Sequence, residues 1–253
     1  MEHETAMHDS VMEERMLDEY VAVDLEMTGL RARTDRILEI GAVKVKQGQI
    51  TDSFQRLVNP QMKLPQEIVD LTGITDQMAA AGCDTNCAVE DFLVFSEDLP
   101  LAGHNLIFDY SFLKQYAANH GILLERNGID TLKLARKFLP EAEKKTLDFL
   151  CGYLNIKRDR NHRALEDARA AAELLEYFKE QFGQREPEAF VPCYLQYKAK
   201  KQQPATQIQK KRLQELVEYH KIELNRELES LSRSEASRIT DQIYARYGKV
   251  PLP

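Results

Sequence analysis

The segment at residues 20–29, which reads YVAVDLEMTG, decides the fold. It begins as a short apolar run typical of a buried β-strand, and the acids Asp24 and Glu26 follow at its end. Because side chains alternate between the two faces of a strand, both carboxylates are expected on one face, about 6 to 7 Å apart along the backbone. This spacing allows them to share a divalent cation, although a solvated strand end explains this short stretch equally well.

The pattern after this segment predicts a mixed sheet covered by helices. Apolar runs predict further strands at residues 37–45, 50–58, 100–103 and 121–124. Apolar residues with a helical period predict helices at residues 66–71, 88–97, 109–120, 131–138, 147–154 and 164–182. Three strands followed by alternating helices and strands indicate an α/β fold.

We divide the chain into four parts. Residues 1–19 form an acidic N-terminal extension that is expected to be flexible, because no apolar period is sustained there. Residues 20–183 form the main domain, and residues 184–204, which contain three prolines, form a linker. Residues 205–253 form a small helical module, in which Ser232 and Glu235 have the spacing of a capping box.

The composition excludes several classes of protein. The chain has 253 residues, a formal charge of −7 and four cysteines. No apolar run approaches the roughly 20 residues that span a bilayer, so we expect a cytoplasmic protein with reduced thiols and no membrane contact. The negative charge argues against a protein that holds nucleic acid by its overall field, but acids that bind metal ions reverse the local sign.

Two further segments add acids and a histidine. Asp109 comes shortly after Gly103-His104-Asn105 at the expected start of a helix, where an acid also serves as an ordinary cap. His162 and Asp167 are five positions apart, and on a continuous helix they would lie about 140° apart around its axis. They can face one cavity only if His162 lies in the loop before the helix. An exposed histidine and a solvated acid are the alternative.

Together these residues supply the groups that phosphodiester hydrolysis requires. Carboxylates can hold two divalent ions about 3.5 to 4 Å apart, one activating water and the other stabilising the departing 3′ oxygen. A histidine, with an ordinary pKa near 6.5, can take the proton from that water at neutral pH. The set consists of Asp24, Glu26, Asp109, Asp167 and His162.

In order and spacing, these segments resemble the three motifs of the DEDDh exonucleases, most closely the proofreading (epsilon) type of bacterial DNA polymerase III. The resemblance covers residues 20–182. It implies a ribonuclease-H-like fold with a five-stranded mixed sheet flanked by helices. It also implies a metal-dependent 3′-5′ exonuclease that hydrolyses DNA from its 3′ end, in proofreading or repair, and releases nucleoside 5′-monophosphates. The implied partners are single-stranded or 3′-frayed DNA and a DNA polymerase.

Carried over residue by residue, the resemblance implies a role for each acid. Asp24, Glu26 and Asp167 would bind the catalytic Mg²⁺ or Mn²⁺, Asp24 would bridge to a second ion held by Asp109, and His162 would be the general base. The residues that would touch the last nucleotides are Thr28, Gly29, Thr72, Ile74, His104 and Asn105. An ordinary helix stop, with Gly73 in a left-handed conformation, also explains the Thr72-Gly73-Ile74 stretch.

Two other functions fit parts of the pattern. Residues 24–30 also resemble the first motif of oligoribonuclease, which would make short RNA the substrate, but the later segments do not follow that relative. An inactive docking module would be expected to lack an acid or the base, and none is missing here. The basic C-terminal module would hold single-stranded substrate, meet a partner, or simply pack on the main domain.

Overall fold

The computed structural model describes residues 17–158, 162–224 and 227–250 of the chain. The flexible extension expected at residues 1–19 falls outside the described residues except for its last three, and Glu19 already begins the first strand.

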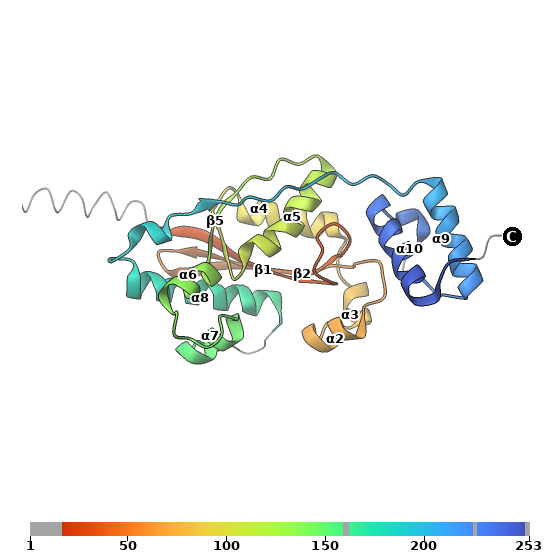
Figure 1. Ribbon diagram of the computed structural model, residues 1–253. Coiled ribbons are helices and arrows are strands. Elements are labelled where there is room, and N and C mark those ends of the chain that lie inside the picture. The colour runs from red at the N-terminus through yellow and green to blue at the C-terminus, as the bar shows by residue number, and fades with distance from the viewer. Residues whose placement is uncertain (1–16, 159–161, 225–226, 251–253) are drawn as a thin grey trace, which may run out of the picture.

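One six-stranded mixed sheet with helices on both faces forms the centre of the fold (Figure 1). The strands are β1 (Glu19–Met27), β2 (Ile37–Lys46), β3 (Gln49–Leu57), β4 (Leu101–Gly103), β5 (Asn127–Asp130) and β6 (Cys193–Tyr194). They are arranged in the order β3-β2-β1-β4-β5-β6, in which β1, β4 and β5 are parallel and the other neighbouring pairs are antiparallel. The expected fold class is confirmed, and the two-residue strand β6 adds a sixth strand at one edge.

The helices occupy both faces of the sheet and the region beyond one end of it (Figure 1). They are α2 (Gln66–Thr72), α3 (Asp76–Ala80), α4 (Thr85–Ser96), α5 (Leu106–His120), α6 (Thr131–Phe138), α7 (Leu147–Leu154), α8 (Ala164–Phe182), α9 (Gln207–His220) and α10 (Arg233–Tyr247), with short 3-10 turns η1 (Pro187–Phe190) and η2 (Leu228–Ser230). Within the described part of the chain, no helix combines the length and the apolar character needed to cross a membrane.

The alternation of β1 divides the core into two layers. Val21 and Val23 belong to the cluster that packs against α4 and α5, whereas Tyr20 and Ala22 belong to the cluster that packs against α6 and α8. Since every second side chain shares a face, the Tyr20 and Ala22 face continues to Asp24 and Glu26. The strand therefore directs both acids towards the layer that contains α8.

Gly41 on β2 allows α8 to lie directly on the sheet beside Asp24. Gly41 pairs in register with Asp24 of β1. A Cβ atom at position 41 would lie 2.1 Å from the carbonyl carbon of Ala164, the first residue of α8, so the close approach requires glycine. The contact brings the N-terminal turn of α8, which carries Asp167, to the end of β1.

Some expected elements differ from the structure; the helix expected at residues 88–97, for example, begins at Thr85. The strand expected at residues 121–124 is a return loop: Gly121 ends α5 with φ +73°, and the Ile122 N–H donates to the Ala117 carbonyl at 2.9 Å. Ile122 and Leu124 of this loop pack on the core, and the strand forms instead at β5, a few residues later. The helix expected to begin at Asp109 begins one turn earlier, at Leu106.

The C-terminal helices form a module with a small core of its own. Leu213 and Leu216 of α9 pack with Ile243 of α10. The expected capping box is confirmed, because the Glu235 N–H donates to Ser232 Oγ at 3.3 Å and the Ser232 N–H donates to Glu235 Oε2 at 2.8 Å. The module lies at the end of the sheet where β1 passes into β2 (Figure 1).

Candidate active site

Four acids from three separate elements meet where β1 ends. Asp24 and Glu26 lie on β1, while Asp109 and Asp167 lie in the first turns of α5 and α8. The Leu25 N–H donates to Asp109 Oδ1 at 3.2 Å, which joins α5 to β1 between the two strand acids. One oxygen of Glu26, one oxygen of Asp167 and one ring nitrogen of His162 lie within 4.8 Å of one another.

His162 precedes α8, as the spacing argument requires. The helix begins at Ala164, and His162 has a left-handed conformation with φ +57°. The side chain is 43% exposed, and its Nε2 lies 3.8 Å from Asp148 Oδ2. The imidazole therefore reaches both the acid cluster and the solvent that would supply a water molecule.

Glu39 is a part of the site that the sequence analysis missed. This fully buried carboxylate pairs in register with Glu26 across the sheet. It accepts hydrogen bonds from Arg163 at 2.7 and 3.0 Å, from the Ala164 N–H at 3.1 Å and from Gln55 at 2.7 Å. Glu39 thus anchors the residue that follows His162. A charged residue inside the apolar run at residues 37–45 is the sequence signal that could have found it.

Arg158 enters the acid cluster from the segment after α7. Its side chain is 5% exposed and forms ion pairs with Asp167 Oδ1 and with Asp148 Oδ1. Arg158 is not among the residues predicted from the sequence. Its guanidinium is the positive charge that faces Asp167, one of the predicted metal ligands.

The crowding of acids raises the pKa values of three carboxyl groups. Burial, with the charges of Asp109 and Glu26, raises the pKa of Asp24 well above its ordinary value. Burial, with the charges of Glu39 and Asp109, raises the pKa of Glu26 to about 7. Burial also raises the pKa of Asp109, although the hydrogen bond from the Leu25 N–H opposes the increase. In each case the surroundings penalise the charged form, so an added positive charge would be stabilising.

The donor set fits divalent cations. Among the described residues, no group donates a hydrogen bond to the carboxylate of Asp24 or Glu26, and Arg158 is the cation that pairs with Asp167. Buried carboxylates without donors require a counter-charge. Hard cations such as Mg²⁺ and Mn²⁺ prefer carboxylate oxygens, and the imidazole of His162 lies close enough to act beside them.

The loop after β1 carries the first pair of predicted nucleotide contacts. Thr28 is nearly buried, and its Oγ1 accepts a hydrogen bond from the Arg36 N–H at 2.9 Å. The Thr28 N–H in turn donates to the Arg36 carbonyl at 2.8 Å. Gly29 lies against Asp35, because a Cβ at position 29 would be 2.5 Å from Asp35 Oδ2. Both residues follow Met27, the last residue of β1, at the edge of the acid cluster.

Thr72 and Ile74 are placed differently. Gly73 ends α2 with φ +69°, in the left-handed stop that the sequence suggests. Thr72 Oγ1 donates to the Ile68 carbonyl at 2.8 Å, and Ile74 is fully buried in a cluster with Leu38. The Ile74 side chain therefore serves the core in this structure.

His104 and Asn105 lie between β4 and α5. The His104 Nε2 lies 2.7 Å from the Lys145 carbonyl and its Nδ1 lies 3.0 Å from Thr131 Oγ1, so both ring nitrogens have protein partners. Burial lowers the pKa of His104, which favours the neutral ring. Asn105 is exposed in a left-handed conformation with φ +67°, and its N–H donates to Asp130 Oδ1 at 2.9 Å. Its side chain is thus available to a ligand.

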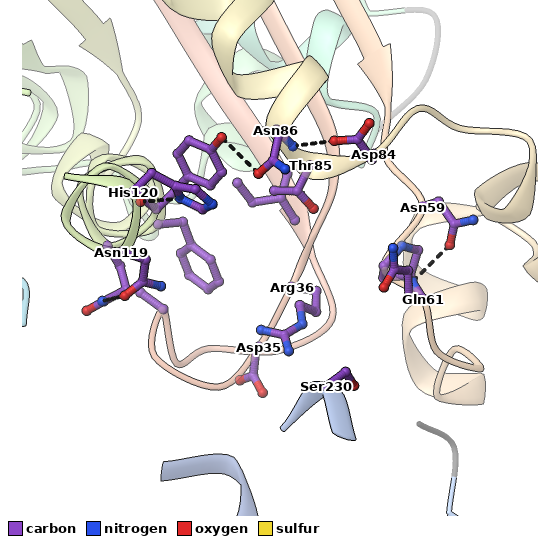
Figure 2. A pocket seen from close by; sticks show the side chains of 16 residues that line it. Asp35, Arg36, Asn59, Gln61, Asp84, Thr85, Asn86, Asn119, His120 and Ser230 are labelled. Atoms are coloured by element: carbon purple, nitrogen blue, oxygen red, sulfur yellow. Dashed lines mark hydrogen bonds between the residues drawn. The ribbon is translucent and has the colours of Figure 1, made fainter. Parts of the chain in front are cut away.

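A polar cavity of about 370 Å³ lies apart from the acid cluster (Figure 2). Its lining includes residues of the β1–β2 loop, of α4 and of α5, together with Ser230 of the C-terminal module. Its polar groups bond to one another: the Tyr116 hydroxyl donates to Asn86 Oδ1 at 3.0 Å, and the Asn86 N–H donates to Asp84 Oδ1 at 2.8 Å. None of the five residues predicted for catalysis lines this cavity.

Comparison with known proteins gives the same fold and names a family. A family model described as exonuclease (RNase T) matches residues 21–175. The chain is 38% identical over 165 residues to the PolC-type DNA polymerase III of Clostridium perfringens, a match that covers 65% of this chain and 11% of that protein. It is 41% identical over 165 residues to the PolC-type DNA polymerase III of Bacillus subtilis, covering 64% of this chain and 12% of that protein.

Solved structures with low identity share the fold. Exonuclease X in complex with 5′-overhanging duplex DNA is similar with a TM-score of 0.53 and 24% identity, covering 68% of this chain and 96% of that one. Exonuclease I is similar with a TM-score of 0.58 and 18% identity, covering 68% of this chain and 42% of that one. At these identities the likeness establishes the arrangement of helices and strands.

Proposed function

The chain belongs to the exonuclease family whose model matches residues 21–175, and we propose that it removes nucleotides one at a time from the 3′ end of DNA. The observation that carries the proposal is the meeting of the acids of β1, α5 and α8 with His162. We further propose that residues 20–183 form the exonuclease domain, followed by a connecting segment at 184–204 and a helical module at 205–253.

The choice of DNA rests on the relatives. The chain spans about a tenth of the length of the curated relatives it matches, and these are named as DNA polymerases. One structural neighbour was solved with duplex DNA. Action on DNA is therefore our proposal for this chain, and so is a link to a polymerase in proofreading.

The acids of the cluster divide into two groups of metal ligands. We assign Asp24, Glu26 and Asp167 to one divalent cation, and Asp24 with Asp109 to a second. When bound, two such ions supply an activated water and stabilise the charge that develops on the departing 3′ oxygen. The raised pKa values of Asp24, Glu26 and Asp109 support this assignment, because cations would favour the ionised forms that the protein alone disfavours.

His162 is assigned as the base. It accepts a proton from the water that attacks the last phosphodiester, as the bond between phosphorus and the 3′ oxygen of the preceding nucleotide breaks. That oxygen takes up a proton from solvent, so the products are a nucleoside 5′-monophosphate and a strand with a new 3′-hydroxyl. Asp148 Oδ2 lies 3.8 Å from the Nε2 of the ring.

The terminal nucleotide is assigned to the edge of the cluster where Thr28 and Gly29 follow β1. The exposed Asn105 side chain provides a further polar contact from the start of α5. For Thr72, Ile74 and His104 the predicted contacts stay predictions. The Ile74 side chain is buried and both His104 ring nitrogens have protein partners, so any contact would use other atoms of these residues.

The test uses the full chain with 5′-labelled substrates. Single-stranded DNA, duplex DNA with a 3′ mismatch, and RNA of matched sequence are incubated with Mg²⁺ or with chelator. The expected result is a ladder that shortens from the 3′ end of DNA, requires the metal and is abolished in Asp24→Asn and Asp167→Asn. Glu166→Gln is the matched control, because Glu166 adjoins Asp167 in sequence but lies outside the cluster.

Three outcomes would change the proposal. Faster digestion of RNA than of DNA would mean that the protein is an exoribonuclease. Cleavage retained in Asp24→Asn would refute the metal assignment. Intact substrates with both Mg²⁺ and Mn²⁺ would favour a docking module without catalytic activity.

A further inference from the structure

We propose that the C-terminal module completes a groove that holds the single strand on the 5′ side of the nucleotide to be removed. The groove has a volume of about 640 Å³ and lies between the β1–β2 loop, the start of α5 and the first turns of α10. The inference rests on the proposed function, because it assigns the path of that function's substrate. The ligand is a single-stranded nucleic acid backbone with its bases.

The module is joined to the β1–β2 loop by two ion pairs. Glu235 of α10, whose side chain is 2% exposed, pairs with Arg36. Arg238, one turn later on α10, places its Nη2 3.3 Å from Asp35 Oδ1. Glu235 also caps α10 through the Ser232 N–H, so the orientation of this helix and its contact with the loop depend on the same carboxylate.

The loop residues that receive these contacts also position the residues next to the acid cluster. The backbone of Arg36 holds Thr28 through two hydrogen bonds, at 2.8 and 2.9 Å. Asp35 Oδ2 accepts a hydrogen bond from the Arg31 N–H at 2.9 Å. The module therefore supports the same loop that carries the proposed contacts to the terminal nucleotide.

Three arginines line the groove. Arg31 and Arg33 come from the loop and Arg238 comes from the module, and no carboxylate belongs to the lining. Arg31 and Arg33 are exposed, and within the described part of the chain neither side chain forms a salt bridge. The Nε of Arg238 is buried and has no hydrogen-bond partner among the described residues. In an acidic protein, such a concentration of arginine favours phosphate.

Apolar and aromatic side chains line the same groove. Phe108 of α5 and Tyr197, from the segment that crosses α5, are partly exposed there, and Leu30 is 80% exposed. Aromatic faces beside a basic wall are the usual means of holding single-stranded bases without sequence preference. The combination fits a nucleic acid strand better than it fits an isolated anion.

The groove also begins next to the acid cluster. Its lining includes Asn105 and Phe108, and Phe108 is followed directly by Asp109. Its opposite wall is the loop that leaves β1 just after Glu26. Both walls of the groove therefore begin within a few residues of acids that belong to the cluster.

The polar cavity shown in Figure 2, which the β1–β2 loop also lines, differs from the groove in the charges of its lining. It is lined by the carboxylates of Asp35 and Asp84 and by amide side chains, with Arg36 between them (Figure 2). Carboxylates repel phosphate, so this cavity is unsuited to the strand. The contrast between the two sides of one loop indicates that the arginines of the groove serve a ligand rather than general solubility.

The experiment compares binding of a 3-nucleotide and a 15-nucleotide single-stranded DNA, labelled at the 5′ end, to the full chain in the absence of divalent cations. Fluorescence anisotropy gives Kd for the wild type, Arg238→Ala, Arg33→Ala and the control Arg246→Ala. Arg246 is an exposed arginine on the same helix, outside the groove. These conditions measure binding in the absence of cleavage. A negative result here therefore bears on the groove, whereas the cleavage assay described above tests the proposed function.

We expect Arg238→Ala and Arg33→Ala to weaken binding of the 15-mer by roughly 3- to 10-fold and to reduce its advantage over the 3-mer. Each should lower the slope of log Kd against log salt by about 0.7, the value for one lost contact to a single-stranded phosphate. Wild-type Kd values for both groove variants, or an equal loss in Arg246→Ala, would overturn the proposal. Arg33 forms no ion pair with a described residue, so Arg33→Ala is not expected to disturb the fold. If Arg238→Ala fails to fold, the Kd of Arg33→Ala alone tests the proposal.

Discussion

Arg163 holds the buried carboxylate of Glu39 with two hydrogen bonds, from Nε to Oε2 at 3.0 Å and from Nη2 to Oε1 at 2.7 Å. The Ala164 N–H donates to the same carboxylate at 3.1 Å. Glu39 therefore fixes both the last residue of the loop that carries His162 and the first residue of the helix that carries Asp167. The relationship joins the centre of the sheet to two of the proposed catalytic groups.

Glu39→Gln is expected to lower the cleavage rate without removing a group that touches substrate. Removing one partner of a buried ion pair typically destabilises a protein by about 3–5 kcal/mol, so thermal unfolding should shift downwards. Because His162 and Asp167 would lose their common anchor, kcat should fall more than KM rises, and the dependence of rate on pH should keep its shape. Unchanged kcat in a variant with reduced thermal stability would limit Glu39 to the stability of the fold.

The stability of the metal-free protein is expected to fall as pH rises through the window set by Glu26. Its pKa is raised from an ordinary 4.5 to about 7, so between these values the folded protein binds more protons at this position than the unfolded chain does. Stability contributed by the neutral form is therefore present below the lower value and is lost as pH approaches the higher one. The effect should be on the order of 2 kcal/mol.

Thermal unfolding in chelator, at pH 5 and pH 8, measures this effect. Glu26→Gln removes the ionisable group, so its unfolding temperature should change less between the two pH values than that of the wild type. A difference of about 4 to 8 °C corresponds to the expected free energy. Glu166→Gln, on the adjacent helix α8, is the control, because it removes one carboxylate outside the cluster. Identical pH dependence in the wild type and in Glu26→Gln would contradict the assignment.

His162→Ala is expected to lower the cleavage rate by roughly 100- to 10,000-fold, the usual contribution of a positioned base. The binding of divalent cation by the variant should change little. A negligible loss of cleavage rate in the variant would assign the base elsewhere.

Local patterns account for most of what the sequence predicts correctly. The apolar period of β1 and the spacing between His162 and Asp167 are properties of short segments, and both predict the side chains that meet at the end of the strand. Helix geometry shows that His162 and Asp167 can share a cavity only if His162 lies before the helix, and it does. The capping box of α10 likewise depends on two residues that lie three positions apart.

The features that the sequence analysis missed depend on contacts between distant segments. Glu39 and Arg163 are 124 positions apart, and the sequence around each residue does not predict that the two form an ion pair. Strand β6 consists of two residues, too few to display a period. The apolar run at residues 121–124 has the composition of a strand, but the left-handed Gly121 makes it the return from α5. In each case tertiary packing decides between local alternatives.

Arg158→Ala is expected to strengthen the binding of divalent cations. The guanidinium of Arg158 pairs with Asp167, a proposed metal ligand, and with Asp148, so ion binding competes with this positive charge. Without it, the cluster is more negative and the Kd for Mn²⁺, measured by titration calorimetry, should fall roughly 3- to 10-fold. The metal-free variant should also be less stable, because its carboxylates lose a counter-charge.

Arg169→Ala on α8 is the control, since Arg169 forms no ion pair with the acid cluster among the described residues. Weaker cation binding in Arg158→Ala would mean that the arginine orients Asp167 as a ligand rather than competing for it.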